Sequence, residues 1–134
     1  MDEKVTILVV EDEPSLRLLV RKVLERTGFE VLEAPSGKSA LELWDKGKPH
    51  IDLLLTDMVM PDGISGADLV ERLQNSQPGL KVVFTSGYTA SEVNQKMLGR
   101  TRASFLAKPY THVELARAVR DCLDQNNGKD AAGR

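Results

Sequence analysis

Acidic, hydroxyl and basic side chains stand directly after four short apolar runs of the chain. These runs end in Glu11-Asp12, Asp57, Thr85-Ser86 and Lys108-Pro109. Three carboxylates at one edge of a sheet would repel one another unless a cation compensated them, and an all-oxygen set suits a hard ion such as Mg²⁺. A lysine in the same place would suit a phosphoryl group rather than a neutral substrate. The residue types therefore predict metal-assisted phosphoryl chemistry.

Each of these residues also has an ordinary structural explanation. An acidic pair after a strand is often a helix cap favoured by the helix dipole, which would account for Glu11 and Asp12. A Lys-Pro step is usually a turn, and a Ser after a strand is usually a cap. Four separate strand ends that each supply a residue type needed for phosphoryl transfer favour the functional interpretation.

The apolar runs predict five short strands. The first, Ile7–Val10, is wholly apolar and β-branched or Leu, which is typical of a strand buried on both faces of a parallel sheet. The other predicted strands are Glu30–Ala34, Ile51–Thr56, Lys81–Thr85 and Ser104–Ala107.

Helical patterns separate these strands. Pro14 suits a first helical position and Gly28 ends the first helix, while Ser36 can cap the second. Capping boxes predict helix starts at Ser65 with Asp68 and at Thr111 with Glu114, and a looser helix is expected over residues 91–98. Strands that alternate with helices indicate an α/β fold with a parallel sheet covered on both faces, in which ligands bind beyond the carboxyl ends of the strands.

The composition is that of an ordinary globular domain. The 134 residues are 41% hydrophobic and 28% charged, and a formal charge of −2 argues against direct nucleic-acid binding. The sequence contains no apolar run long enough to span a membrane, and the single Cys122 falls at an apolar helix position, so we expect a cytoplasmic domain with no membrane contact. We expect the domain at residues 1–124 and a flexible tail or linker stub at 125–134.

Four sequence blocks resemble the receiver domain of bacterial two-component signalling. They are Ile7–Pro14, Leu54–Pro61, Val82–Tyr88 and Phe105–Pro109, and they follow the family's order and spacing. The resemblance covers about residues 4 to 124. It implies a flavodoxin-like, doubly wound sheet of five parallel strands in the order 2-1-3-4-5.

The resemblance also implies the roles of the acidic residues. Asp57 would be the phosphoacceptor and a metal ligand, and Asp12 a direct ligand of Mg²⁺. Glu11 would reach the metal through water, and the backbone carbonyl of Val59 would complete the protein ligands.

The remaining roles concern the phosphorylated state. Ser86 would turn its hydroxyl toward the phosphoryl group, Lys108 would form an ion pair with that group, and Phe105 would be the aromatic switch residue. The surface of the fourth helix, fifth strand and fifth helix would carry the response. A cis peptide bond is expected before Pro109.

Three features depart from the commonest family pattern. Glu11 stands where Asp is more usual, and Phe105 stands where Tyr is common. The loop over residues 61–66 is one residue longer than in many stand-alone receivers, and with residues 84–88 it is similar to receivers attached to hybrid histidine kinases. The implied phosphodonor is a histidine kinase or a phosphotransfer protein, or a kinase core fused to the same chain.

Three other functions remain open on the residues alone. A phosphatase of similar fold would need a second Asp two residues after the nucleophile, where this chain has Val59. A receiver-like interaction module that takes no phosphate would be marked by substitutions at Asp57, the acidic pair or Lys108, and all of these residues are present. A flavodoxin-like cofactor binder would need a phosphate-binding loop after the first strand.

Overall fold

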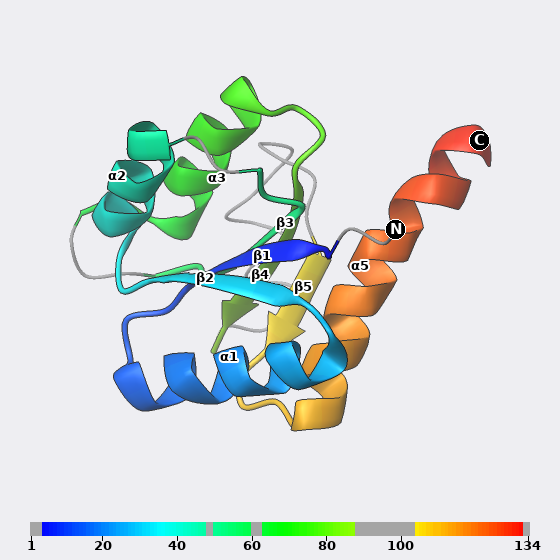
Figure 1. Ribbon diagram of the computed structural model, residues 1–134, viewed down its shortest axis with the longest axis horizontal. Helices are drawn as coiled ribbons and strands as arrows, with labels where there is room; N and C mark the ends of the chain where they lie inside the picture. Colours follow the sequence, from blue (N-terminus) through cyan, green and yellow to red (C-terminus); the bar gives the residue numbers. More distant parts are fainter. Residues whose placement is uncertain (1–3, 48–49, 60–62, 88–103, 133–134) are drawn as a thin grey trace.

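The computed structural model describes the backbone of residues 4–47, 50–59, 63–87 and 104–132. Figure 1 labels its elements, which in chain order are β1 (Thr6–Val10), α1 (Pro14–Thr27), β2 (Glu30–Ala34), α2 (Gly37–Gly47), β3 (Leu53–Asp57), α3 (Gly66–Ser76), β4 (Lys81–Ser86), β5 (Ser104–Ala107) and α5 (His112–Ala132). The helix expected over residues 91–98 lies outside the described residues.

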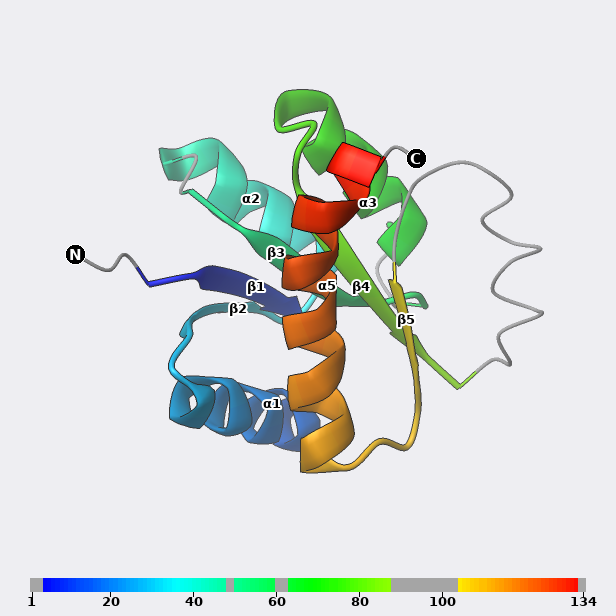
Figure 2. The same ribbon diagram turned by 90° about the vertical axis from the view of Figure 1, so that its right-hand side faces the viewer.

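All five strands form one parallel sheet in the order β2-β1-β3-β4-β5, which confirms the predicted fold. Helices α1 and α5 cover one face of the sheet, and α2 and α3 cover the other (Figures 1 and 2). In register, Val10 pairs with Thr56, Asp57 with Thr85, and the last residue of β4 with the last residue of β5. The carboxyl ends of these strands therefore lie along one edge.

The sheet separates two hydrophobic cores. Leu8 and Leu54 face the core formed with α2 and α3, whereas their neighbours Val9 and Leu55 face the core formed with α1 and α5. The alternation follows from the pleat, which turns successive side chains to opposite faces. Strand β1 is thus buried on both faces, as its apolar sequence predicted.

Cys122 belongs to the core between the sheet and α5. Its Sγ lies 3.7 Å from the backbone carbonyl of Val82, and burial raises the pKa of the thiol. A buried thiol with a raised pKa is a poor nucleophile, which agrees with the prediction that this residue packs in the core.

The helix starts follow the predicted capping residues. Pro14 opens α1, where the Glu13 carboxylate accepts a hydrogen bond of 2.8 Å from the Leu16 amide, and Gly28 ends the helix with a φ of 108°. A left-handed φ of this kind is the conformation that favours glycine after a helix. At the start of α5 the capping box is formed, because Thr111 Oγ1 accepts from the Glu114 amide and Glu114 Oε1 accepts from the Thr111 amide. At the start of α3, Ser65 caps the helix by accepting from the Asp68 amide.

Two predicted boundaries differ from the structure by more than one residue. Strand β3 begins at Leu53 rather than Ile51. The Thr6 amide of the neighbouring strand donates its hydrogen bond to the Asp52 side chain at 2.9 Å. In a longer strand this amide would donate to a backbone carbonyl instead. Helix α5 continues to Ala132, so no break in the backbone marks the tail expected from residue 125. Poor helix formers such as Gly cost only about 1 kcal/mol in a helix and do not force it to end. The domain boundary itself stays a prediction.

Every helix in the described parts of the chain is too short or too polar to cross a lipid bilayer.

The start of α3 packs directly on the end of β3 through Gly66. Its amide donates a 3.0 Å hydrogen bond to the Met58 carbonyl. A Cβ at this position would meet the Asp57 carbonyl oxygen and would lie 3.0 Å from Met58 Cα and 3.2 Å from the Asp57 carbonyl carbon. The backbone around Asp57 is therefore held in place by a helix that only glycine allows so near.

We predict that Gly66→Ala lowers the free energy of unfolding by about 1–3 kcal/mol, because backbone atoms of β3 must move to admit the methyl group. Urea unfolding followed by circular dichroism measures the loss. The matched control is Gly79→Ala, where a Cβ meets nothing within 4 Å, and its stability should change by less than about 0.5 kcal/mol. Equal effects of the two substitutions would disprove the close approach at Gly66.

Candidate functional site

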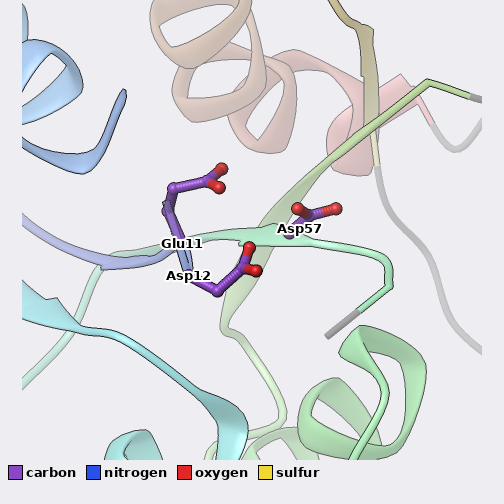
Figure 3. Close-up of side chains that lie close together, drawn as sticks. All are labelled: Glu11, Asp12 and Asp57. Atoms are coloured by element: carbon purple, nitrogen blue, oxygen red, sulfur yellow. The ribbon is translucent and has the colours of Figure 1, made fainter. Parts of the chain in front are cut away.

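The predicted carboxylates lie together at the carboxyl edge of the sheet. Glu11 and Asp12 follow β1, and Asp57 is the last residue of β3. Figure 3 shows their side chains around one space beyond the strand ends, and one carboxylate oxygen from each lies within 4.8 Å of the others. The parallel register brings these three residues together, although 45 positions separate Asp12 from Asp57 in the sequence.

Lys108 joins this cluster from the end of β5. Its Nζ lies 3.0 Å from Asp57 Oδ2 and 3.2 Å from Glu11 Oε1. The Lys108 amide donates to the carbonyl of Ser86 at 2.8 Å, and the Lys108–Pro109 peptide bond is cis, the geometry that the resemblance implied. One ammonium group therefore connects the ends of β1 and β3 with β5.

The polar groups of the site are largely buried. Glu11 is 3% exposed and Asp57 8%, whereas Asp12 is open to solvent. Burial raises the pKa of the Glu11 carboxyl, and the negative charge of Asp57 acts in the same direction, against the opposing effects of the Glu13 amide and Lys108. Burial alone would lower the pKa of Lys108, but its hydrogen bonds and charge interactions with Asp57 and Glu11 outweigh burial and raise it. The ammonium is thus held charged between two carboxylates.

The arrangement suits a divalent cation. Among the described residues, three carboxylates surround the Lys108 ammonium, so the cluster keeps an excess of negative charge. The donors are all oxygens, and the exposure of Asp12 leaves room for water, which Mg²⁺ retains when proteins bind it. The residues present therefore fit the ion that the sequence predicted.

Val59 lies at the rim of the site. Its amide donates to Asp57 Oδ1 at 3.3 Å, and its side chain is 56% exposed. This contact fixes one carboxylate oxygen while Lys108 holds the other. The expected use of the Val59 carbonyl as a metal ligand stays a prediction.

The two predicted switch residues lie on neighbouring strands. Ser86 is buried at the end of β4, and its backbone pairs with Ala107 of β5. Phe105 is half-buried on β5, opposite Phe84, and packs against the core beneath α2 and α3. Their proposed movement on phosphorylation stays a prediction.

Two residues beside the site were missed by the sequence analysis. Burial and the negative charge of Glu11 raise the pKa of Tyr110 to about 12, so its hydroxyl stays protonated near the cluster. Arg17 donates a 2.7 Å hydrogen bond from Nη1 to the Glu11 carbonyl oxygen. In the sequence, Arg17 is a basic residue next to the apolar Leu16 in the first turn of α1. A basic residue at such a position is equally typical of the helix surface, so the sequence contains no specific signal for Arg17.

Comparisons with known proteins agree with this geometry. Residues 7–120 match the family described as the response regulator receiver domain. The chain is 32% identical over 91% of its length to the sensor kinase CckA of Brucella abortus (strain 2308), of which it spans 13%. It is 33% identical over 87% of its length to the response regulator receiver protein CpdR of the same organism, of which it spans 95%.

A solved structure gives the same result. The crystal structure of the receiver domain from the hybrid histidine kinase CckA aligns with a TM-score of 0.72 and 35% identity, covering 88% of this chain and 98% of that one.

We predict that Lys108→Met, measured in EDTA near pH 7, lowers the free energy of unfolding by about 1–3 kcal/mol, because two largely buried carboxylates lose their cation. The lower part of this range is expected because the lysine side chain is 24% exposed. Urea unfolding measures the change, and Lys22→Met on the exposed surface of α1 is the control.

The decrease in the free energy of unfolding caused by Lys108→Met should become smaller as the pH falls. The folded-state pKa of Glu11 is raised above its ordinary value of 4.5, so Glu11 takes up a proton in the folded protein before it does so in the unfolded chain. At about pH 4 the neutral carboxyl no longer needs the ammonium. A loss that is constant between about pH 7 and about pH 4 would contradict the ion-pair assignment.

Proposed function

Because the chain belongs to the response regulator receiver domain family, we propose that Asp57 is the side chain that accepts the phosphoryl group and that Glu11, Asp12 and Asp57 hold Mg²⁺ beside it. Family membership makes the chain a phosphoryl-accepting receiver domain of two-component signalling. The observation that carries the residue assignment is the contact of Lys108 with Asp57 inside the carboxylate cluster.

The proposed reaction is transfer of a phosphoryl group from a phosphohistidine. The phosphorus–nitrogen bond breaks, a bond forms between phosphorus and an Asp57 carboxylate oxygen, and the donor histidine keeps the electron pair of the broken bond. Mg²⁺, when bound, would neutralise charge on the phosphoryl oxygens. The Val59 amide and the Lys108 ammonium contact different oxygens of Asp57 and thereby orient its carboxylate.

Lys108 has a second proposed role after transfer. Its ammonium lies 3.0 Å from the oxygen that would carry or adjoin the phosphoryl group, so it can form an ion pair with the added charge of about −1.5 to −2. In this proposal Ser86 then turns its hydroxyl to a phosphoryl oxygen, and Phe105 fills the space that Ser86 vacates. The response surface would include β5 and α5, while the expected helix over residues 91–98 falls outside the described residues.

The proposed donor is a histidine kinase or a phosphotransfer protein. The similarity to one part of the CckA sensor kinase supports a kinase core fused to the same chain as an alternative source of the phosphoryl group. We propose that the domain promotes its own phosphorylation and is otherwise a signalling module rather than a turnover enzyme. Its expected cytoplasmic location stays a prediction.

We predict that acetyl phosphate with Mg²⁺ adds one phosphoryl group to the wild-type protein and none to Asp57→Asn, as measured by intact-protein mass spectrometry. EDTA should abolish the addition, because the carboxylate cluster then lacks the cation that offsets phosphoryl charge. Asp121→Asn, an exposed position on α5, is the control and should react like wild type. Phosphorylation of Asp57→Asn at the wild-type rate would refute the assignment.

We also predict that Val59→Asn speeds loss of the phosphoryl group several-fold, a change on the order of 1 kcal/mol in the barrier. Val59 has no polar side-chain atom to hold a water in line with the acyl phosphate bond, whereas an amide can hold one. The decay of phosphoprotein after removal of the donor measures the effect.

The control for this lifetime prediction is Val113→Asn. It makes the same change at an exposed valine in the first turn of α5 and should leave the decay rate as in wild type. A Val59→Asn decay equal to or slower than wild type would count against control of water access by Val59. In this proposal Tyr88, two residues after Ser86, also flanks the phosphoryl group, and it lies outside the described residues.

A further inference from the structure

Arg17 connects the acidic turn after β1 to the second strand of the sheet. Its Nη1 donates to the Glu11 carbonyl oxygen at 2.7 Å, and its Nε lies 3.4 Å from Glu33 Oε1 on β2. A guanidinium group has its donors in a fixed plane, so two contacts of this kind fix the direction of both partners. Arg17 contacts this turn from the first turn of α1.

The turn that Arg17 contacts is built from acidic side chains. The Glu13 amide donates to Glu11 Oε2 at 3.2 Å, and the Glu13 carboxylate caps α1. Glu11 and Asp12 must therefore face Asp57 from a turn only three residues long between β1 and α1. The Arg17 contact holds the backbone of this turn at Glu11, the first residue after β1.

We propose that Arg17 is a positioning residue for the Mg²⁺ site: it holds the Glu11 carbonyl so that Glu11 and Asp12 face Asp57. This inference rests on the proposed function, because it concerns the same metal site. Arg17 contacts the metal-binding turn and not the ion. Groups that orient metal ligands typically contribute about tenfold or more to metal affinity.

The charge of Arg17 makes this proposal testable by the sign of the effect. A positive group next to a cation site weakens cation binding through repulsion, so loss of the charge alone would strengthen the binding of Mg²⁺. Loss of positioning would weaken it. A decrease in Mg²⁺ affinity on removal of Arg17 therefore has to come from the geometry of the turn.

Arg21 provides a matched control one turn further along α1. Its Nη1 lies 2.7 Å from Glu33 Oε2, and its Nε lies 3.3 Å from Glu25. Arg21 thus shares the carboxylate that Arg17 contacts, and its ion pairs with Glu25 and Glu33 lie away from Glu11. Its side chain is 43% exposed, against 20% for Arg17. Removal of Arg21 takes away one charge and two ion pairs, and we expect it to leave the metal-binding turn in place.

The first experiment is a Mg²⁺ titration of the unphosphorylated protein followed by NMR amide shifts. Arg17→Met, which keeps the aliphatic stem, is expected to weaken Mg²⁺ binding about tenfold, and Arg21→Met is expected to bind like wild type. Arg17→Lys keeps the charge but has only one donor group, and it should weaken binding by a smaller factor, about two- to threefold. This second variant also serves if Arg17→Met does not fold.

A second measurement needs no metal. In EDTA, hydrogen exchange of the Glu13 amide reports the order of the turn, because that amide donates to the Glu11 carboxylate. Arg17→Met should speed this exchange, and Arg21→Met should leave it unchanged. A purely global loss of stability in Arg17→Met would instead speed exchange of the buried strand amides together with that of Glu13.

The outcomes separate the two proposals. Binding of Mg²⁺ by Arg17→Met as tight as or tighter than wild type, or unchanged exchange at Glu13, would overturn the positioning role and leave the proposed function intact. Failure of the wild-type protein to bind Mg²⁺ would overturn the proposed function and the positioning role with it.

Discussion

The ion contacts of Lys108 are the interaction on which the site depends. The ammonium lies between Glu11 and Asp57 and so connects the ends of three strands at one edge of the sheet. Without a cation, the two buried carboxylates would repel each other in a region where solvent screens charge poorly. The backbone supports the same connection, because the Lys108 amide donates to the carbonyl of Ser86. The fifth strand therefore takes part in the electrostatics of the first and third.

At the carboxyl end of β1 the sequence changes from apolar to acidic within one residue. Val10 is almost fully buried among apolar side chains, and Glu11, the next residue, is equally buried but charged. The apolar segments form the sheet by burial on both faces, and the polar residues follow at the carboxyl ends of the strands, where folds of this type bind ligands. Stability and chemistry thus come from adjacent parts of the same strands, and Gly66 keeps one helix close to the junction between them.

Local signals in the sequence were sufficient to predict the strands, the helices and the gathering of the acidic residues at the carboxyl edge of a parallel sheet. The strand order was implied by the resemblance to the receiver family, and the structure confirms it. Buried strands have an apolar period that is easily recognised, and capping residues such as Ser65 and Thr111 act within one helical turn. The start of β3 was predicted two residues early because Asp52 takes a hydrogen bond from Thr6, 46 positions away. The role of Arg17 could not be predicted for a similar reason. It contacts a backbone carbonyl, and because every residue has one, the residue types in the sequence do not indicate such a contact. The roles of Ser86 and Phe105 concern a phosphorylated state and remain predictions.

The division of the hydrophobic interior by the sheet has a consequence for how such a protein changes over evolution. Leu8 and Val9 are neighbours in the chain but pack with different helices on opposite sides. Substitutions that share no neighbours have nearly additive effects on stability. The surface formed by α2 and α3 can therefore diverge without repacking of α1 and α5, so that new binding specificities can arise on one side while the other keeps its existing contacts.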